Sequence, residues 1–169
     1  RFGKFGLTIH PDKTRLVLFQ RPQPRSPGKG ASLCGCPGTF DFLGFTHYWC
    51  RSRRGNWVVK RKTAADRFRR AVQAISFWCR RHRHDSVDEQ QRKLNQKLQG
   101  HYAYYGITGN FPSLNSYREL VQRIWQQWLN RRNRERSLTW AIMGRLLQRY
   151  PLARARIVRK TVLRSESST

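Results

Sequence analysis

The sequence LQGHYAYYGITGN occupies residues 98–110 and marks the end of a predicted helix. Apolar residues at helical spacing form one face of this helix: Leu94, Leu98, Tyr102 and Tyr105. Upstream, Ser86 is followed three residues later by Glu89, the pattern of a capping box at a helix start. Gly106 and the Gly109–Asn110 pair are typical of a helix end. The stretch therefore predicts a helix that begins near Ser86 and ends in a tight turn.

The segments on either side of this helix also have a helical apolar period. Before it, one face is formed by Phe68, Ala71, Val72, Ile75, Trp78 and Cys79. After it, one face is formed by Leu114, Tyr117, Leu120, Val121, Ile124 and Trp128. Ser137 is then in position to cap a fourth helix, Leu138–Arg149, which ends before Pro151. These patterns predict a small domain of three to four amphipathic helices.

The first third of the chain has a pattern typical of strands and loops. Residues 40–49 and 56–60 are rich in Phe, Trp and Val and flank a turn at Arg51–Gly55, which predicts a β-hairpin. The Pro- and Gly-rich residues 21–38 predict a long loop. The predicted fold class is therefore α+β, with a short N-terminal β-hairpin before the helices. The expected domains are an N-terminal piece of strands and loops at 1–62, a helical domain at 63–158 and a disordered tail at 159–169.

Charge is the strongest signal in the composition. The 35 Lys+Arg residues exceed the 9 Asp+Glu residues and give a formal net charge of +26, whereas a free globular domain usually carries a charge of magnitude about 2–8. A hydrophobic content of 38% and an aromatic content of 12% argue against a disordered basic tail. No apolar run approaches the ~20 residues of a membrane span. The composition therefore predicts a folded domain that binds a nucleic acid.

Basic runs, most of them rich in arginine, supply the candidate nucleic-acid contacts. Arginine offers bidentate phosphate contact and planar stacking that lysine does not, and the arginine runs are expected to lack acidic neighbours. A solvated charged face is the alternative interpretation. The candidates are Arg51, Arg53, Arg54, Lys60, Arg61, Lys62, Arg69, Arg70, Arg80, Arg81, Arg83, Arg131, Arg132, Arg134 and Arg136.

The aromatic residues divide between core and binding positions. Tyr102 and Tyr105 share the apolar face of their helix, whereas Tyr104 points elsewhere and is the better candidate to stack on a base. His101 lies beside the apolar face, where we expect a capping or hydrogen-bonded histidine. The predicted core also includes one tryptophan of the pair Trp125 and Trp128, and the phenylalanines Phe40, Phe42 and Phe45.

The cysteines give only a weak indication of a metal site. Cys34, Cys36, His47 and Cys50 could be arranged around zinc, but the C-x-C spacing departs from the usual C-x₂₋₄-C. Reduced thiols, as in a cytosolic protein, are the preferred interpretation. We therefore expect no metal ligand among these residues.

Five short motifs together resemble a known family. They are GLTIHPDKT at residues 6–14, FDFLGF at 40–45, LQGHYAYYGITGN at 98–110, WLNRR at 128–132 and LTW at 138–140. The first two look like the last palm blocks of a group II intron-encoded reverse transcriptase, or maturase. The other three resemble the maturase-specific domain of that family, which is also called the thumb or X domain. The resemblance spans about residues 5–158.

The resemblance also indicates which parts of the family's active site are missing. Family members hold two Mg²⁺ ions for nucleotidyl transfer with a Tyr-Ala-Asp-Asp motif and a further aspartate. This sequence has no Asp-Asp pair, so that motif would lie upstream of Arg1, and we expect neither a catalytic residue nor a cofactor in these residues. The family block that contains Lys13 lies beside the incoming nucleotide, which implies a phosphate contact or proton donation. An exposed lysine after a turn is the alternative.

The function that the resemblance implies is RNA binding. The expected role is to bind intron RNA and so assist splicing and retrohoming. The implied partners are group II intron RNA, a primer-template or target DNA, and the missing N-terminal fingers and palm, with no membrane partner. The implied location is the bacterial cytoplasm, within a ribonucleoprotein. The alternative is that the chain is part of an active RNA-directed DNA polymerase whose catalytic aspartates lie upstream of Arg1.

Overall fold

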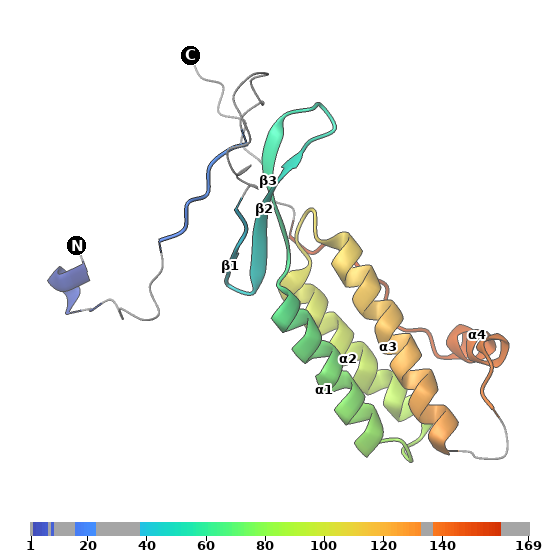
Figure 1. Cartoon of the computed structure of the whole chain (residues 1–169). Helices are drawn as coiled ribbons and strands as arrows, with labels where there is room; N and C mark the ends of the chain where they lie inside the picture. Colours follow the sequence, from blue (N-terminus) through green and yellow to red (C-terminus); the bar gives the residue numbers. More distant parts are fainter. Residues whose placement is uncertain (1, 7, 9–15, 23–37, 133–136, 160–169) are drawn as a thin grey trace, which may run out of the picture. The chain divides into compact units, whose positions relative to one another are not determined.

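The structure is a computed structural model that describes residues 2–6, 8, 16–22, 38–132 and 137–159 (Figure 1). A three-stranded sheet precedes four α-helices in the described residues, which confirms the predicted α+β class. The elements are η1 (Phe2–Phe5), β1 (Phe40–Phe42), β2 (Phe45–Arg51), β3 (Trp57–Thr63), α1 (Ala65–Arg81), α2 (Val87–Tyr105), α3 (Phe111–Arg132) and α4 (Trp140–Arg149). None of the helices described is long and apolar enough to cross a membrane.

The sheet has the strand order β1-β2-β3. The sequence predicts a single strand over residues 40–49, but a turn at Leu43 and Gly44 divides that stretch into β1 and β2. Both turn residues have positive φ, 48° at Leu43 and 79° at Gly44, as tight hairpin turns require. Leucine seldom adopts this conformation, so the turn leaves no clear signal in the sequence. The predicted two-stranded hairpin is therefore a three-stranded sheet.

The chain divides into two compact units. The sheet unit comprises Arg1–Phe42 with His47–Lys60, and the helical unit comprises Leu43–Thr46 with Arg61–Thr169. The β1–β2 turn belongs to the helical unit, and the hydroxyl of Tyr104 donates a hydrogen bond to the Leu43 carbonyl in that turn over 2.9 Å. All four α-helices belong to the helical unit.

Aromatic packing organises the sheet unit. The ring of Phe19 lies 4.9 Å from that of Phe40 and 5.3 Å from that of Trp49, measured between centroids. Phe42, in contrast, is 59% exposed. Its predicted core position is wrong, because it lies at the end of β1 beside the tight turn, where the described elements do not cover it.

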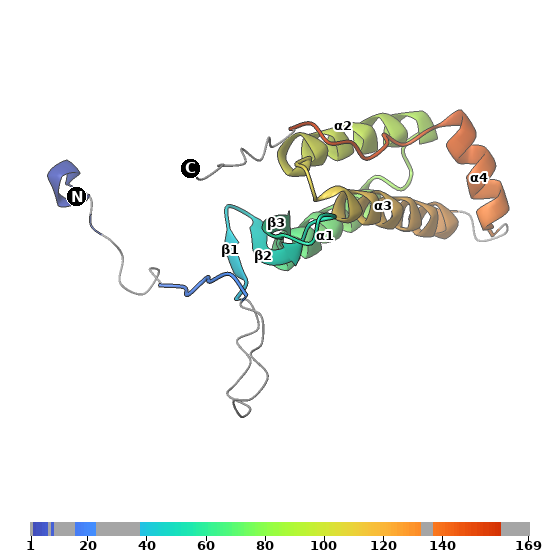
Figure 2. The ribbon, with the colours of Figure 1, turned by 90° about the horizontal axis from the view of Figure 1, so that it is seen from above.

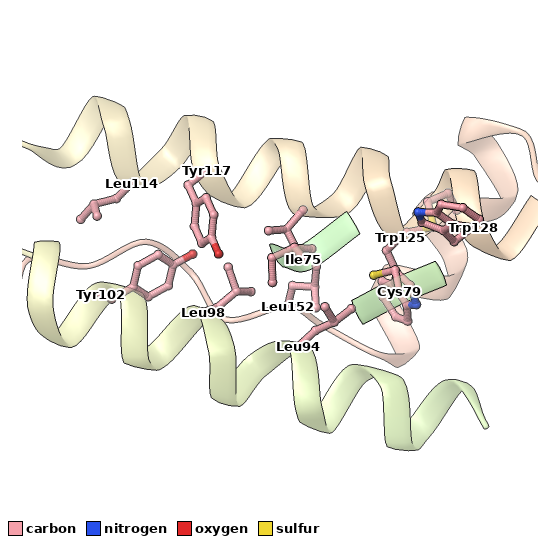
Figure 3. Close-up of a cluster of buried hydrophobic side chains, with 12 residues drawn as sticks. Ile75, Cys79, Leu94, Leu98, Tyr102, Leu114, Tyr117, Trp125, Trp128 and Leu152 are labelled. Carbon is pink, nitrogen blue, oxygen red and sulfur yellow. The ribbon is translucent and has the colours of Figure 1, made fainter. Parts of the chain in front are cut away.

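Helices α1, α2 and α3 run side by side, and α4 runs across their direction (Figure 1 and Figure 2). Their apolar faces meet in one core (Figure 3). Its buried members are Ile75, Cys79, Leu94, Leu98, Tyr102, Leu114, Tyr117, Val121, Trp125, Trp128, Met143 and Leu152. The helical periods predicted from the sequence are therefore confirmed. Both Trp125 and Trp128 are buried, whereas the sequence interpretation placed only one of them in the core.

Helix α2 begins and ends where the sequence predicts. The Ser86 hydroxyl accepts a hydrogen bond from the Glu89 N–H over 3.2 Å, which confirms the predicted cap. At the other end, the Gly106 N–H donates to the Tyr102 carbonyl over 2.8 Å. A Cβ atom at Gly106 would lie 2.3 Å from that carbonyl oxygen. The close approach of the backbone therefore requires glycine at this position.

Helix α4 begins later than the sequence predicts. Its cap is Thr139, whose hydroxyl accepts a hydrogen bond from the Ile142 N–H over 3.4 Å, so the predicted cap at Ser137 is wrong. The cause is a contact made by another helix, because the Asn130 side chain on α3 accepts a hydrogen bond from the Leu138 N–H. Gln126 on α3 also donates a hydrogen bond to the Leu138 carbonyl over 2.8 Å, so both backbone groups of Leu138 are bound to α3 and the helix begins at the next hydroxyl.

After α4 the chain returns to α2 as an irregular segment, Pro151–Arg159, which we name the return segment (Figure 2). The Tyr102 hydroxyl donates a hydrogen bond to the Ala153 carbonyl over 3.2 Å. Farther along, the Val158 N–H donates to the Gly106 carbonyl over 2.7 Å. The return segment therefore lies along α2, and it adds its own buried side chain, Leu152, to the core.

Candidate nucleic-acid interface

One face of the last turns of α1 carries an aromatic and several basic groups. Phe77, Arg80, Arg81 and His84 follow each other at the spacing that places helical residues on one face. The helix itself ends at Arg81, and His84 follows in the turn that leads to α2. The opposite face of α1 is anchored in the core through buried residues such as Ile75. Core packing therefore fixes the basic face of α1 toward solvent.

These side chains line an open cavity of about 460 Å³, together with Arg83. Arg80, Arg81 and His84 are exposed, and Phe77 is 71% exposed. The Nε of Arg83 donates a hydrogen bond to Nε2 of His84 over 2.8 Å, which holds two of the lining groups together. We name the five lining residues the α1-end patch.

The α1–α2 turn, which carries part of the α1-end patch, is fixed from within the helical unit. Nδ1 of His82 and Oδ2 of Asp85 lie 2.8 Å apart, so the acid nearest to the patch in sequence already has a partner. Gln90 donates a hydrogen bond to the Asp85 carbonyl over 2.9 Å and accepts one from the Trp125 indole over 2.8 Å. Both Gln90 and Trp125 are buried. The position of the turn is thus tied to the packing of the core.

The two exposed arginines of the α1-end patch have no carboxylate partner in the described part of the chain. Ion pairs in that part of the chain include Arg67–Asp66, Arg70–Asp66, His82–Asp85 and Arg92–Glu89, and neither Arg80 nor Arg81 takes part in them. Arg80 and Arg81 lie instead in the last turn of α1, where the helix dipole favours a positive charge. That interaction leaves their guanidinium N–H groups available to an external anion.

The end of α3 brings two more candidates to the same end of the bundle. Arg131 and Arg132 are exposed and lie in the last turn of α3. Nη1 of Arg132 donates a hydrogen bond to the Asp85 carbonyl over 2.9 Å, which places the end of α3 beside the α1–α2 turn (Figure 1). The guanidinium of Arg131 lies 4.8 Å from the centroid of the Trp128 ring. Two helices therefore contribute basic residues to one end of the helical unit.

The candidates Arg69 and Arg70 lie apart from that end. Arg69 precedes Arg80 by three helical turns, about 16 Å along the axis. Nη2 of Arg70 donates to Oδ2 of Asp66 over 2.6 Å, and this hydrogen bond holds the pKa of Asp66 below its usual value. The expectation that these arginine runs lack acidic neighbours is therefore wrong for Arg70. The helix itself brings the two side chains together, because residues four apart are neighbours on its surface.

The basic candidates of the first third lie at the end of β2, in the β2–β3 turn and in β3. Nη1 of Arg51 donates a hydrogen bond to the Gly55 carbonyl over 2.9 Å, and its guanidinium lies 4.7 Å from the centroid of the Trp57 ring. Arg51 therefore stabilises the β2–β3 turn, while Arg53 and Arg54 are exposed within that turn. Strand β3 contributes the remaining three candidates, Lys60, Arg61 and Lys62.

Tyr104 is 52% exposed, as its place off the apolar face predicts. Its ring stacks on that of Phe45 with the centroids 5.9 Å apart, and its hydroxyl donates to the Leu43 carbonyl. These contacts connect α2 to the β1–β2 turn. The stacking of Tyr104 on a base stays a prediction, and its ring already has an aromatic neighbour within the helical unit.

The environment of His101 differs from the sequence interpretation. Its Nε2 is buried and has no hydrogen-bond partner among the described residues, so the hydrogen-bonded histidine is not found at that atom. The ring stacks on Tyr117 with the centroids 3.9 Å apart and lies 4.6 Å from that of Tyr105. Burial lowers the pKa of His101 to about 4. The imidazole is therefore neutral near pH 7 and adds no charge to the interface.

Some of the predicted positions lie outside the described residues. They are Lys13, Arg134, Arg136, Cys34, Cys36 and residues 160–169 of the predicted tail. Cys50 and Cys79 are described and are free thiols, and burial raises the pKa of Cys79 to about 12. Across the residues that the structure describes, no group of three His, Cys, Asp or Glu side chains could hold a metal ion.

The sequence interpretation missed two members of the α1-end patch, Phe77 and His84. Their spacing from Arg80 and Arg81 is visible in the sequence, and a search for aromatic residues on basic helix faces would have found it. No family model, curated protein or solved structure matches the chain. The functional proposal therefore rests on the residues and their arrangement.

Proposed function

We propose that this chain binds structured RNA through the basic end of its helical unit. The observation that carries the proposal is the α1-end patch, in which exposed arginines without a described carboxylate partner line an open cavity. Arginine N–H groups donate in pairs to phosphate oxygens. Structured RNA is recognised mainly by shape, phosphates and 2′-hydroxyls, which suits a rigid helical surface rich in arginine.

The resemblance to group II intron maturases supplies the class of RNA. On this proposal the chain binds folded intron RNA and stabilises it, which assists splicing and retrohoming, with a primer-template or target DNA as a further partner. The fingers and palm of such a protein are proposed as further partners. The mechanism is electrostatic and positional, because the α1-end patch offers cations and one aromatic ring. The location that fits this role is the bacterial cytoplasm, within a ribonucleoprotein.

A salt titration of RNA binding tests the electrostatic part of the proposal. The variant Arg80→Gln with Arg81→Gln removes two charges from the α1-end patch. We expect weaker binding and a slope of log affinity against log salt that is shallower by about one for each phosphate that the variant no longer binds. The matched control removes two exposed charges elsewhere, through Arg123→Gln with Arg145→Gln. Equal slopes for both double variants would contradict the proposal.

A competition experiment tests the class of RNA. Any protein of this charge binds polyanions non-specifically, with a dissociation constant of about 10⁻⁴–10⁻⁶ M near physiological salt. We expect a folded group II intron RNA to displace a labelled intron fragment at much lower concentration than bulk duplex DNA does. Equal displacement by the two competitors would leave only non-specific binding and would refute the maturase role.

A further inference from the structure

We infer that the α1-end patch holds an unpaired RNA nucleotide, with the base stacked on Phe77 and the flanking phosphates bound by Arg80 and Arg81. The inference rests on the proposed function, because it names the part of the RNA that this site takes. It goes beyond that function, because phosphate contacts alone would serve a duplex equally well.

The exposure of Phe77 is the first observation. The ring is 71% exposed on a helix whose other large aromatic residues have partners. On the neighbouring position, the Trp78 ring stacks on His82 with the centroids 4.8 Å apart and lies 5.6 Å from Nζ of Lys97. Among the described residues, Phe77 forms no such ring pair and takes no cation over its face. It is therefore an aromatic surface that a ligand could cover.

The surroundings of Phe77 select the kind of ligand. The cavity of about 460 Å³ is within the size range of small-ligand sites, roughly 300–1,000 Å³. Its lining combines a single aromatic ring with Arg80, Arg81, Arg83 and His84. An apolar peptide or a lipid tail would leave those guanidinium groups without acceptors. A nucleotide satisfies both parts of the lining, because it carries a flat apolar ring system and an adjacent anion.

The geometry of RNA helices favours an unpaired nucleotide. In a duplex each base is covered by its neighbours, and side chains cannot enter the deep, narrow major groove. An exposed phenylalanine can therefore stack only on a base that has left the helix, as in a loop, a bulge or a strand end. The arginines that follow Phe77 by three and four residues lie on the same face of α1, within reach of the phosphates on either side of such a base.

His84 gives the site a further polar group. Its Nε2 accepts the hydrogen bond from Nε of Arg83, so in this tautomer the proton resides on Nδ1. Nδ1 can then donate to a base edge or a 2′-hydroxyl. The same bond orients Arg83, so the turn side of the cavity is organised before the ligand arrives.

Binding of two matched RNAs tests the inference on the full chain. The probes are a short single-stranded RNA with a central 2-aminopurine and a fully paired RNA duplex. We expect Phe77→Ala to weaken binding of the single strand by about 5- to 150-fold, the range found for loss of one base–aromatic stack. Duplex affinity should stay unchanged, and Phe77→Tyr should retain both affinities. The fluorescence change of 2-aminopurine on binding should be lost in Phe77→Ala and kept in Phe77→Tyr.

The control variant is Phe111→Ala, which removes a 48% exposed phenylalanine at the start of α3. If Phe77→Ala binds the single strand like the parent, while Arg80→Gln with Arg81→Gln weakens binding, the stacking inference is wrong and the proposed function stands. If neither variant changes binding, both fail. Equal losses for single strand and duplex, or for Phe77→Ala and Phe111→Ala, would also overturn the inference.

Discussion

Asn110 and Thr63 exchange two hydrogen bonds although they lie 47 positions apart in the sequence. The Thr63 N–H donates to Oδ1 of Asn110, and Nδ2 of Asn110 donates to the Thr63 hydroxyl, each over 2.9 Å. Nδ2 also donates to the Tyr105 carbonyl over 2.8 Å. Asn110 is fully buried, with 0% of its surface exposed. One side chain therefore joins the end of β3 to the α2–α3 turn.

The variant Asn110→Ala should lower the free energy of unfolding by about 1–3 kcal/mol for each buried group left without a partner. Thr63 is buried, and its N–H loses its acceptor in that variant. Urea unfolding of the full chain, followed by circular dichroism, measures the effect. The control Asn115→Ala removes an exposed bond to Glu119 and should change stability by less than about 0.5 kcal/mol. A similar loss in both variants would show that Asn110 is not the joining residue.

Two glycines of the same region should respond in opposite directions to alanine. A Cβ at Gly106 would lie 2.3 Å from the Tyr102 carbonyl oxygen and 2.9 Å from that of Arg156. Gly106→Ala should therefore displace the return segment, lower stability and speed hydrogen exchange at the Val158 amide. Gly100 lies within α2 with open space around its Cβ position, so Gly100→Ala should raise stability by about 0.5–1 kcal/mol. Stabilisation by both changes would contradict the close contact at Gly106.

The partly buried His101 should make stability depend on pH. Its pKa is lowered to about 4 by burial, against about 6.5 in an unfolded chain. Between these values the unfolded state binds more protons than the folded state, so stability falls as the pH is lowered from 6.5 to 4 and changes no further through this group below 4. His101→Phe keeps a flat ring against Tyr117 and should abolish this part of the pH dependence. If the free energy of unfolding falls equally in parent and variant between pH 6.5 and pH 4, His101 is not the source of this pH dependence.

Two adjacent arginines of α1 offer a matched test of the candidate contacts. Arg70 is paired with Asp66, whereas Arg69 has no carboxylate partner in the described part of the chain. We expect Arg69→Gln to reduce the salt dependence of RNA binding more than Arg70→Gln does, because the carboxylate already offsets the charge of Arg70. Filter binding of the same RNA at a series of salt concentrations gives both slopes. If Arg70→Gln reduces the salt dependence more than Arg69→Gln does, the expectation is wrong, and the Arg70–Asp66 ion pair opens when RNA binds.

The helical part of the fold could be predicted because its signals are local. The apolar period of α2 and the cap at Ser86 depend on residues within one or two turns, and both are confirmed. The turn at Leu43 could not be predicted, because a leucine with positive φ is held there by Tyr104 from α2. The start of α4 depends in the same way on Asn130, a residue of another helix.

The candidate site also combines features that local sequence predicts with features that depend on tertiary contacts. Single arginines such as Arg80 stand out in the sequence through charge and spacing. Which of them meet is decided by tertiary contacts, such as the bond from Arg132 to the Asp85 carbonyl. The exposure of Phe77 was open to prediction, because this residue lies outside the apolar period of α1 and shares a helix face with Arg80 and Arg81.

The return segment has a consequence for the order of events during translation. Leu152 is buried in the core, and the Tyr102 hydroxyl finds its acceptor at Ala153. A nascent chain folds from its N-terminus as it is made, so α1, α2 and α3 leave the ribosome before the segment that completes their core. Until Pro151–Arg159 emerges, the bundle exposes apolar surface that a chaperone can bind. Ribosome-bound chains halted before residue 151 should therefore be more sensitive to protease than chains halted well beyond residue 159.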